Sequence, residues 1–149
     1  MSKIVYVDMD DVLCDFTGAR DAAISKVPEI KFPQSQYGFY ESLVPILGAI
    51  EAVNLLIESA QYEPYVLTAP STRNPLCYTE KRIWIEKHFG FEFTEKLIIC
   101  SNKGLLKGDY LIDDKSEGRG QETFEGRLLQ FGGAEYKDWN AILNELGIV

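Results

Sequence analysis

Cysteine and histidine are scarce in this chain, which has three cysteines and one histidine among 149 residues. Cys14, Cys77 and Cys100 are far apart and form no CxxC pair. Together with the lone His88 they offer too few suitably spaced ligands for a zinc site. An odd number of well-separated cysteines is typical of reduced thiols. We therefore expect a cytoplasmic protein without disulfides.

Basic residues are also in deficit, with 15 Lys and Arg against 23 Asp and Glu and a formal charge of −8. No cluster of Lys and Arg interrupts the acidic background, so the chain lacks the basic face that a general nucleic-acid binder requires. An anionic small molecule remains a suitable substrate, because a metal ion and one or two basic side chains would make a pocket locally positive.

Long hydrophobic runs are absent. No stretch approaches the ~20 apolar residues of a membrane span. The first apolar run is short and acids interrupt it, so we expect no signal peptide and no membrane partner. A hydrophobic content of 46% with 26% charged residues is typical of a soluble globular protein. We expect one domain over residues 1–149 with a small insertion.

What the sequence does contain is an acidic cluster directly after its first apolar run. Residues 4–7 are rich in β-branched side chains, which predicts a strand buried on both faces, as in a parallel sheet. Asp8, Asp10, Asp11 and Asp15 follow at once. Ligands of open α/β sheets bind at the carboxyl ends of the strands. Crowded carboxylates repel one another unless a cation lies between them, and hard oxygen ligands favour Mg²⁺.

The remaining apolar patterns alternate between the two periods of secondary structure. We expect further strands at residues 64–68, 96–100, 110–113 and 127–131. We expect helices at residues 16–27, 45–60, 78–89 and 138–146, with Pro45 opening the second. Alternating strands and helices predict an α/β fold with a mostly parallel sheet and right-handed crossovers. The link between residues 100 and 110 has room only for a loop.

Residues 28–44 differ in character from the rest, with two prolines, a glycine and four aromatic residues. With the preceding helix they predict a small cap over about residues 16–44. The aromatic side chains either form a satellite core or provide a platform that stacks on a flat ligand such as a nucleobase.

Polar side chains end three of the expected strands: Asp8 and Asp10, then Thr68, then Asp113 and Asp114. Lys103 follows the third strand. These groups suit phosphoryl transfer. One carboxylate can attack phosphorus, and a second one two residues later can act as general acid. A Mg²⁺ ion held by carboxylates can neutralise the phosphate, while a lysine and a hydroxyl bind its oxygens.

At this point the motifs resemble a known family. Asp8-Met-Asp-Asp-Val resembles the first motif of the haloacid dehalogenase-like (HAD) phosphohydrolases, and Thr68, Lys103 and Asp113-Asp114 match the later three motifs in order. The stretches DMDDVLCDF, LTAP, NKGLLKGDYLIDD and EKRIWIEKHFG are similar to the 5′(3′)-deoxyribonucleotidases. This resemblance, over nearly the whole chain, implies a three-layer HAD-like fold with a small cap after the first strand. It also implies a Mg²⁺-dependent nucleoside monophosphate phosphatase.

The resemblance implies a role for each acid. Asp8 would be the nucleophile, forming an aspartyl-phosphate, and a Mg²⁺ ligand. Asp10 would be the acid and base and would offer its backbone carbonyl to the metal. Asp113 would be the second carboxylate ligand, with Asp114 bonding a metal-bound water. The family commonly has glycine where this chain has Asp11, which we expect to be structural or exposed.

The resemblance also implies which residues bind the substrate. Phosphate would contact Thr68, the Ala69 N–H and Lys103. The aromatic residues that would enclose the nucleobase are Phe16, Phe39 and Tyr40.

Other charged residues near the motifs have simpler interpretations. We expect Asp15 to cap the first helix. We expect Arg73 and Lys81 to be surface charges, although each could reach a substrate phosphate.

Three other functions stay open at this stage. A HAD phosphatase of another small phosphorylated metabolite would use the same motifs. A phospho-receiver domain also places acids, a threonine and a lysine around Mg²⁺, but its phospho-acceptor lies mid-chain and its lysine follows the last acid, whereas Lys103 precedes Asp113. A catalytically idle nucleotide binder is the third, although the motif set is complete. The small cap leaves the site open, so the second subunit of a homodimer would help to cover it.

Overall fold

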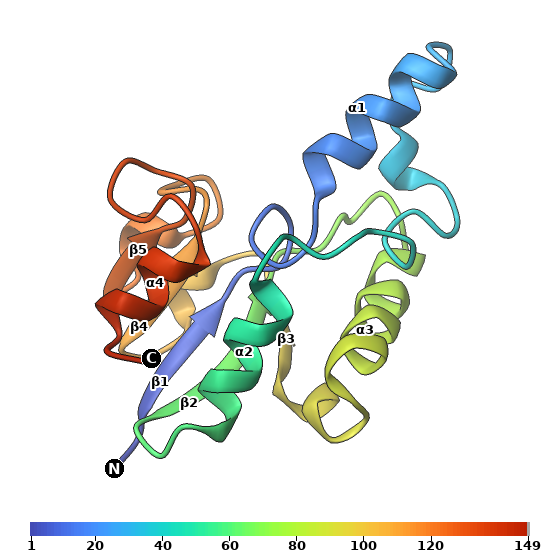
Figure 1. The fold of residues 1–149 in the computed structure, drawn as a ribbon. Coiled ribbons are helices and arrows are strands. Elements are labelled where there is room, and N and C mark those ends of the chain that lie inside the picture. The colour runs from blue at the N-terminus through green and yellow to red at the C-terminus, as the bar shows by residue number, and fades with distance from the viewer. Residues whose placement is uncertain (149) are drawn as a thin grey trace.

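The structure, a computed structural model, describes residues 1–148 and is built on one five-stranded parallel sheet (Figure 1). The strands are β1 (Lys3–Val7), β2 (Tyr62–Thr68), β3 (Leu97–Ile99), β4 (Tyr110–Asp113) and β5 (Arg127–Gln130). Each overlaps a short run for which the sequence predicted a strand. The α/β fold with a parallel sheet is thus confirmed.

The strand order is β3-β2-β1-β4-β5, which puts β1 in the centre of the sheet. Tyr6 of β1 pairs with Tyr65 of β2 on one side and with Leu111 of β4 on the other. The order reverses between β1 and β4, and in open α/β sheets such a switch point is where ligands bind. Receiver domains have the order 2-1-3-4-5, so this topology excludes the receiver alternative.

The described residues form four α-helices beside the sheet: α1 (Phe16–Lys26), α2 (Ala49–Glu58), α3 (Leu76–Phe89) and α4 (Trp139–Glu145). Short 3₁₀-helices are η1 (Pro33–Ser35), η2 (Glu92–Lys96), η3 (Lys103–Leu105) and η4 (Gln121–Thr123). Helix α1 has no buried residue and projects away from the sheet (Figure 1). Across residues 1–148, no helix combines the length and apolar character needed to cross a membrane.

The two faces of the sheet have different cover. Val5 and Val7 of β1 belong to the large core cluster with helices α2, α3 and α4. Tyr6 points to the opposite face and packs in a smaller cluster with Phe124. The crossover loop between β3 and β4 lies over this second face, where the Tyr6 hydroxyl donates to the Lys107 carbonyl at 2.7 Å. The third layer is therefore built from loops and 3₁₀-helices.

The predicted start of the second helix at Pro45 is wrong, because α2 begins at Ala49. Pro45 instead forms an antiparallel bridge with Cys14. Gly48 then adopts a left-handed conformation with φ 83° at the N-cap, a conformation that glycine adopts without steric cost. The chain thus turns at Gly48 before the helix can start.

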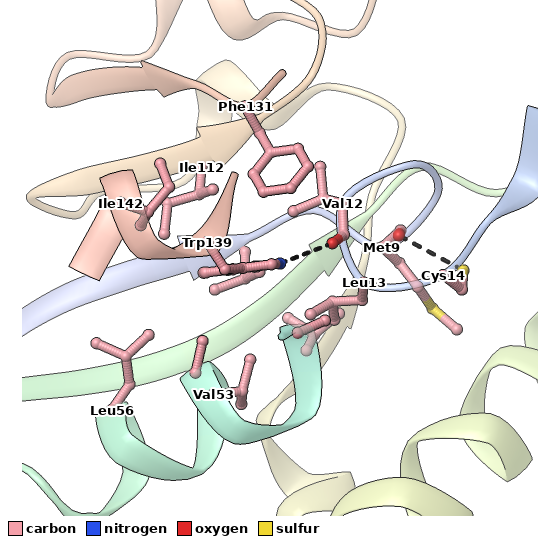
Figure 2. Packing of buried hydrophobic residues seen from close by; sticks show 14 of the residues in the cluster. Met9, Val12, Leu13, Cys14, Val53, Leu56, Ile112, Phe131, Trp139 and Ile142 are labelled. Atoms are coloured by element: carbon pink, nitrogen blue, oxygen red, sulfur yellow. Dashed lines mark hydrogen bonds between the residues drawn. The ribbon is translucent and has the colours of Figure 1, made fainter. Parts of the chain in front are cut away.

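The loop that carries the acidic cluster is itself part of the core. Met9, Val12, Leu13 and Cys14 are fully buried between the acids. The Met9 carbonyl accepts backbone N–H groups from the other three. The Trp139 indole donates to the Val12 carbonyl at 3.0 Å (Figure 2). Burial of these four residues therefore holds the acids beside them at the edge of the sheet.

Candidate active site

A cleft of about 390 Å³ lies at the carboxyl edge of the sheet, beside the ends of β1 and β4. The structure brings together there all the predicted site residues except Phe39. The cleft is lined by Asp8, Asp10, Phe16, Tyr40, Thr68, Ala69, Lys103, Asp113 and Asp114.

Three carboxylates meet at the floor of this cleft. Asp8 directly follows β1, and Asp113 is the last residue of β4. Asp8, Asp113 and Asp114 each offer an oxygen within 4.8 Å of the others. Burial raises the pKa of Asp8 well above its usual range, and burial also raises the pKa of Asp114. A cation would remove this penalty, and a set of three carboxylate oxygens fits a hard divalent ion such as Mg²⁺.

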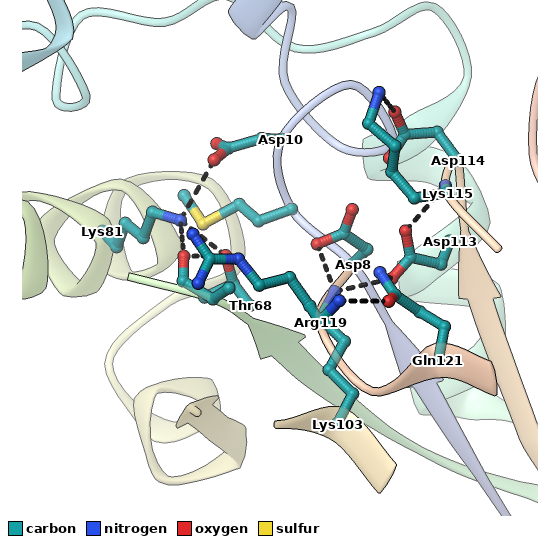
Figure 3. A network of polar contacts seen from close by, with 12 residues as sticks. Asp8, Asp10, Thr68, Lys81, Lys103, Asp113, Asp114, Lys115, Arg119 and Gln121 are labelled. Atoms are coloured by element: carbon teal, nitrogen blue, oxygen red, sulfur yellow. Dashed lines mark hydrogen bonds and ion pairs between the residues drawn. The ribbon is translucent and has the colours of Figure 1, made fainter. Parts of the chain in front are cut away.

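Lys103 supplies positive charge to the same acids (Figure 3). Its Nζ donates to Asp8 Oδ1 at 2.8 Å and to Asp113 Oδ2 at 2.6 Å. Burial by itself lowers the pKa of Lys103, but the two neighbouring carboxylates raise it above its usual value. The lysine therefore stays protonated. It is held in place by η3, whose N-cap Asn102 accepts from the Gly104 N–H.

Gln121 is a buried partner of Asp113 that sequence reasoning missed. Its Nε2 donates to Asp113 Oδ2 at 3.2 Å, while its Oε1 accepts from the Arg119 N–H at 2.7 Å. The other Asp113 oxygen accepts from the Lys115 N–H. All three contacts fix the orientation of the Asp113 carboxylate. A glutamine in a glycine-rich loop carries no pattern that would have identified it.

Lys81 lies in the site, so its predicted position at the surface is wrong. The side chain is fully buried and its Nζ donates to Thr68 Oγ1 at 2.5 Å, to the Ala69 carbonyl at 2.9 Å and to Asp10 Oδ2 at 3.2 Å. The signal was present: Lys81 falls on the same stripe of α3 as Trp84 and Ile85, at the spacing of a buried helix face. Arg73, by contrast, is exposed as predicted.

Asp10 forms the wall of the cleft opposite the Asp8 and Asp113 pair (Figure 3). Its side chain keeps 26% of its surface exposed, so it remains accessible to a ligand. Oδ2 faces the Lys81 ammonium, and Oδ1 accepts from the Cys14 thiol at 3.7 Å. Burial and the Asp10 charge raise the pKa of the Cys14 thiol, which stays protonated and can donate.

The three predicted aromatic residues pack together beside the cleft. Phe16 and Tyr40 stack with centroids 5.9 Å apart and planes 25° apart. Phe39 lies edge-on to both, at 5.6 Å and 5.4 Å. It supports the two rings and does not line the cleft. Burial raises the pKa of Tyr40, so its hydroxyl is neutral.

Asp11 and Asp15 organise the start of α1. Asp15 is the N-cap and accepts from the Gly18 N–H at 2.9 Å, which confirms the predicted cap. Asp11 has φ 64° and accepts from both the N–H and the hydroxyl of Thr17. A left-handed residue explains physically why glycine suits this position. Asp11 thus has a structural role at the rim of the cleft.

Two arginines also line the cleft without having been predicted. Arg119 comes from the loop between β4 and β5, and Arg20 comes from α1. The Arg20 guanidinium lies 5.7 Å from the centre of the Phe16 ring. Together with Lys81 and Lys103 they bring positive charge to a cleft that is otherwise lined by carboxylates.

A central β1 flanked by β2 and β4, with acids at the ends of β1 and β4, defines a HAD-type α/β protein. A crystal structure of a HAD family hydrolase from Deinococcus radiodurans R1, with bound phosphate and sodium, has the same fold, with a TM-score of 0.51. The similarity covers 99% of this chain and 89% of that chain at 15% identity. It supports the fold alone.

Sequence comparisons define the family more closely. The family model described as 5′ nucleotidase, deoxy (Pyrimidine), cytosolic type C protein matches residues 28–137. A Vibrio phage KVP40 protein assigned to the 5′(3′)-deoxyribonucleotidases is 33% identical over 96% of this chain and 84% of its own length. The human cytosolic 5′(3′)-deoxyribonucleotidase is 39% identical over 79% of this chain and 73% of its own. The chain belongs to the 5′(3′)-deoxyribonucleotidase family, whose members are phosphoric monoester hydrolases.

Proposed function

We propose that this protein removes the phosphate from deoxyribonucleoside monophosphates through an aspartyl-phosphate on Asp8, with Mg²⁺ as cofactor. The supporting observation is the placement of two carboxylates, two residues apart, on opposite sides of one cleft. Asp8 faces Lys103 and Asp113, whereas Asp10 faces Lys81. This arrangement separates the attacking group from the group that handles the proton.

In the first step an Asp8 oxygen attacks phosphorus and the bond from phosphorus to the sugar oxygen breaks. Asp10 gives its proton to that departing oxygen. In the second step Asp10 removes a proton from water, and the water oxygen attacks the aspartyl-phosphate. Inorganic phosphate leaves, and Asp8 and Asp10 return to their starting states. Lys81 positions Asp10 for both transfers through the 3.2 Å contact.

Asp8 and Asp113 would hold the metal with their carboxylates and Asp10 with its backbone carbonyl, while Asp114, whose carboxylate lies close to both acids, would bond a water on the metal. When bound, Mg²⁺ supplies positive charge that neutralises the phosphate. The protein holds the Asp113 ligand through Gln121, which donates to one of its oxygens.

The substrate phosphate would contact the Thr68 hydroxyl, the Ala69 N–H and Lys103. Lys81 adds a cation to this group, because its Nζ already contacts Thr68 and the Ala69 carbonyl. Arg119 lines the same cleft and adds a further cation. Such fixed donors stabilise the charge of phosphoryl transfer.

Residues 16–44 would act as the cap, with the base stacking on Phe16 and Tyr40 while Phe39 supports both rings. The stacked pair on the cleft side of the cap supports this assignment. Exposed apolar side chains such as Tyr37 and Leu47 near the cap are consistent with a homodimer, which light scattering would test. A cytoplasmic location stays a prediction, since some relatives are mitochondrial.

The test is phosphate release from deoxy- and ribonucleoside monophosphates, sugar phosphates and an aryl phosphate, each with Mg²⁺ and with EDTA. We expect Mg²⁺-dependent release that favours deoxynucleotides. Asp8→Asn should abolish turnover of all substrates, whereas the control Asp138→Asn should remain active, because asparagine caps α4 as well as aspartate does. Release from sugar phosphates alone would instead favour a HAD phosphatase of another metabolite.

A further inference from the structure

We propose that Glu80 is a positioning residue that sets nucleotide selectivity by holding the aromatic loop of residues 38–41 against the cleft. This inference rests on the proposed function, because it assigns the loop to the nucleobase side of the same site. Glu80 lies on α3. It is distant in sequence from the three carboxylates at the floor of the cleft, and the role proposed for it differs from theirs.

The Glu80 carboxylate holds the loop through three backbone contacts. Oε2 accepts from the Gly38 N–H at 2.8 Å, and Oε1 accepts from the N–H groups of Tyr40 and Glu41 at 3.0 Å and 3.3 Å. The residue is only 2% exposed. No ion pair in residues 1–148 includes it. Hydrogen bonds from one loop thus compensate a buried charge that would otherwise be costly.

The loop is shaped to receive this carboxylate. Gly38 has φ 84°, in the left-handed region, and a left-handed turn can direct successive N–H groups towards one anion. Here the anion is a side chain of the protein itself. Because Glu80 comes from a different element, removing its charge frees the loop without changing the loop's own sequence.

The held loop forms one wall of the cleft. Tyr40 is stacked on Phe16, and the Lys81 Nζ lies 5.2 Å from the centre of the Tyr40 ring. Lys81 is the next residue after Glu80 and contacts Thr68 and Asp10. Two consecutive residues of α3 therefore fix the distance between the aromatic wall and the phosphate side of the cleft.

A nucleotide must engage both sides at once, whereas acetyl phosphate has no base or sugar. Glu80→Gln keeps the size of the side chain but replaces charge-assisted hydrogen bonds with weaker ones. We expect KM for deoxynucleoside monophosphates to rise roughly tenfold, the equivalent of one lost charge-assisted contact. We expect kcat for these substrates, and turnover of acetyl phosphate, to stay near the wild-type values.

Three comparisons separate positioning from a general loss of structure. Glu86→Gln removes a half-exposed carboxylate on the same helix, paired with Arg82, and should leave all kinetic constants unchanged. Glu80→Asp keeps the charge and should recover part of the nucleotide KM. In a Tyr40→Leu background, Glu80→Gln should add no further change in KM, because both substitutions remove the same wall.

Hydrogen exchange measures the same contact without any substrate. The amides of Gly38, Tyr40 and Glu41 should lose protection in Glu80→Gln and keep it in Glu86→Gln. If the wild type hydrolyses acetyl phosphate but no nucleotide, the proposed function fails, and the exchange experiment still tests whether Glu80 holds the loop.

The inference is overturned if Glu80→Gln lowers kcat equally for nucleotides and acetyl phosphate, or if amide protection is unchanged. Should Glu80→Gln not fold, Gly38→Ala addresses the same loop. A Cβ there meets no atom within 4 Å but is strained at φ 84°. It must produce the same nucleotide-selective rise in KM, and an unchanged KM would refute the assignment.

Discussion

Replacing Lys103 with methionine tests the charge balance on which the site depends. The substitution preserves much of the side-chain length but removes the cation between Asp8 and Asp113, which are 7% and 0% exposed. Breaking a buried ion pair in this way costs about 3–5 kcal/mol. The variant can avoid an unpaired buried charge by protonating one of the two carboxylates. Protonating a carboxyl of ordinary pKa at pH 7 costs about 4 kcal/mol, so the loss of stability should not greatly exceed this value. We therefore expect the free energy of unfolding to fall by about 3–5 kcal/mol, which corresponds to a Tm lower by about 10 °C.

The assay is urea unfolding of wild type and Lys103→Met, once in EDTA and once in excess Mg²⁺. We expect the full destabilisation in EDTA and recovery of at least half of it in Mg²⁺, because a cation among the three carboxylates replaces the missing charge. The control is Lys107→Met, an exposed lysine of the same crossover loop, which should change stability by less than about 0.5 kcal/mol. An equal deficit in EDTA and in Mg²⁺ would refute this reasoning.

Three further perturbations address individual contacts. Asp11→Ala should cost about 1–2 kcal/mol in urea unfolding through left-handed strain and the lost Thr17 bonds, whereas Asp11→Gly should stay within about 1 kcal/mol of wild type; equal losses would contradict a role for φ. Burial lowers the pKa of His88, so the unfolded state takes up the proton first and wild-type stability should fall as the pH drops below about 6.5. In His88→Phe that part of the pH dependence should be absent, and parallel profiles would exclude it. Gln121→Leu should raise the Mg²⁺ concentration for half-maximal activity about 10- to 100-fold by freeing Asp113; an unchanged requirement would dismiss this role.

Local patterns were sufficient for most of the fold and for the acids of the site. Short apolar runs located the five described strands, because strands in the interior of a parallel sheet are nearly continuous apolar segments. The acids at the ends of β1 and β4 met as predicted, since the carboxyl ends of parallel strands share one edge. Asp8 and Asp113 could thus be placed together from their positions in the sequence alone.

These local patterns could not predict contacts between elements that are distant in the sequence. Whether Pro45 starts a helix depends on its bridge to Cys14, about thirty residues earlier. Lysine is usually exposed, so Lys81 was assigned to the surface although its helical spacing indicated a buried face. Its burial is possible because Asp10, in the loop after β1, and Thr68, at the end of β2, accept its hydrogen bonds. The burial of Glu80 is likewise explained only by the loop from whose N–H groups it accepts hydrogen bonds.

The same division between local and distant contacts explains how an acidic cluster can be both crowded and ordered. Met9 is fully buried, so its neighbour Asp8 cannot move away from Asp113 and Asp114 without disrupting the core. The Trp139 indole, near the other end of the chain, fixes the Val12 carbonyl in the same loop. Packing energy therefore maintains the unfavourable proximity of the carboxylates. A site held in this way is preorganised, because packing fixes the positions of the carboxylates before a cation or a phosphate binds.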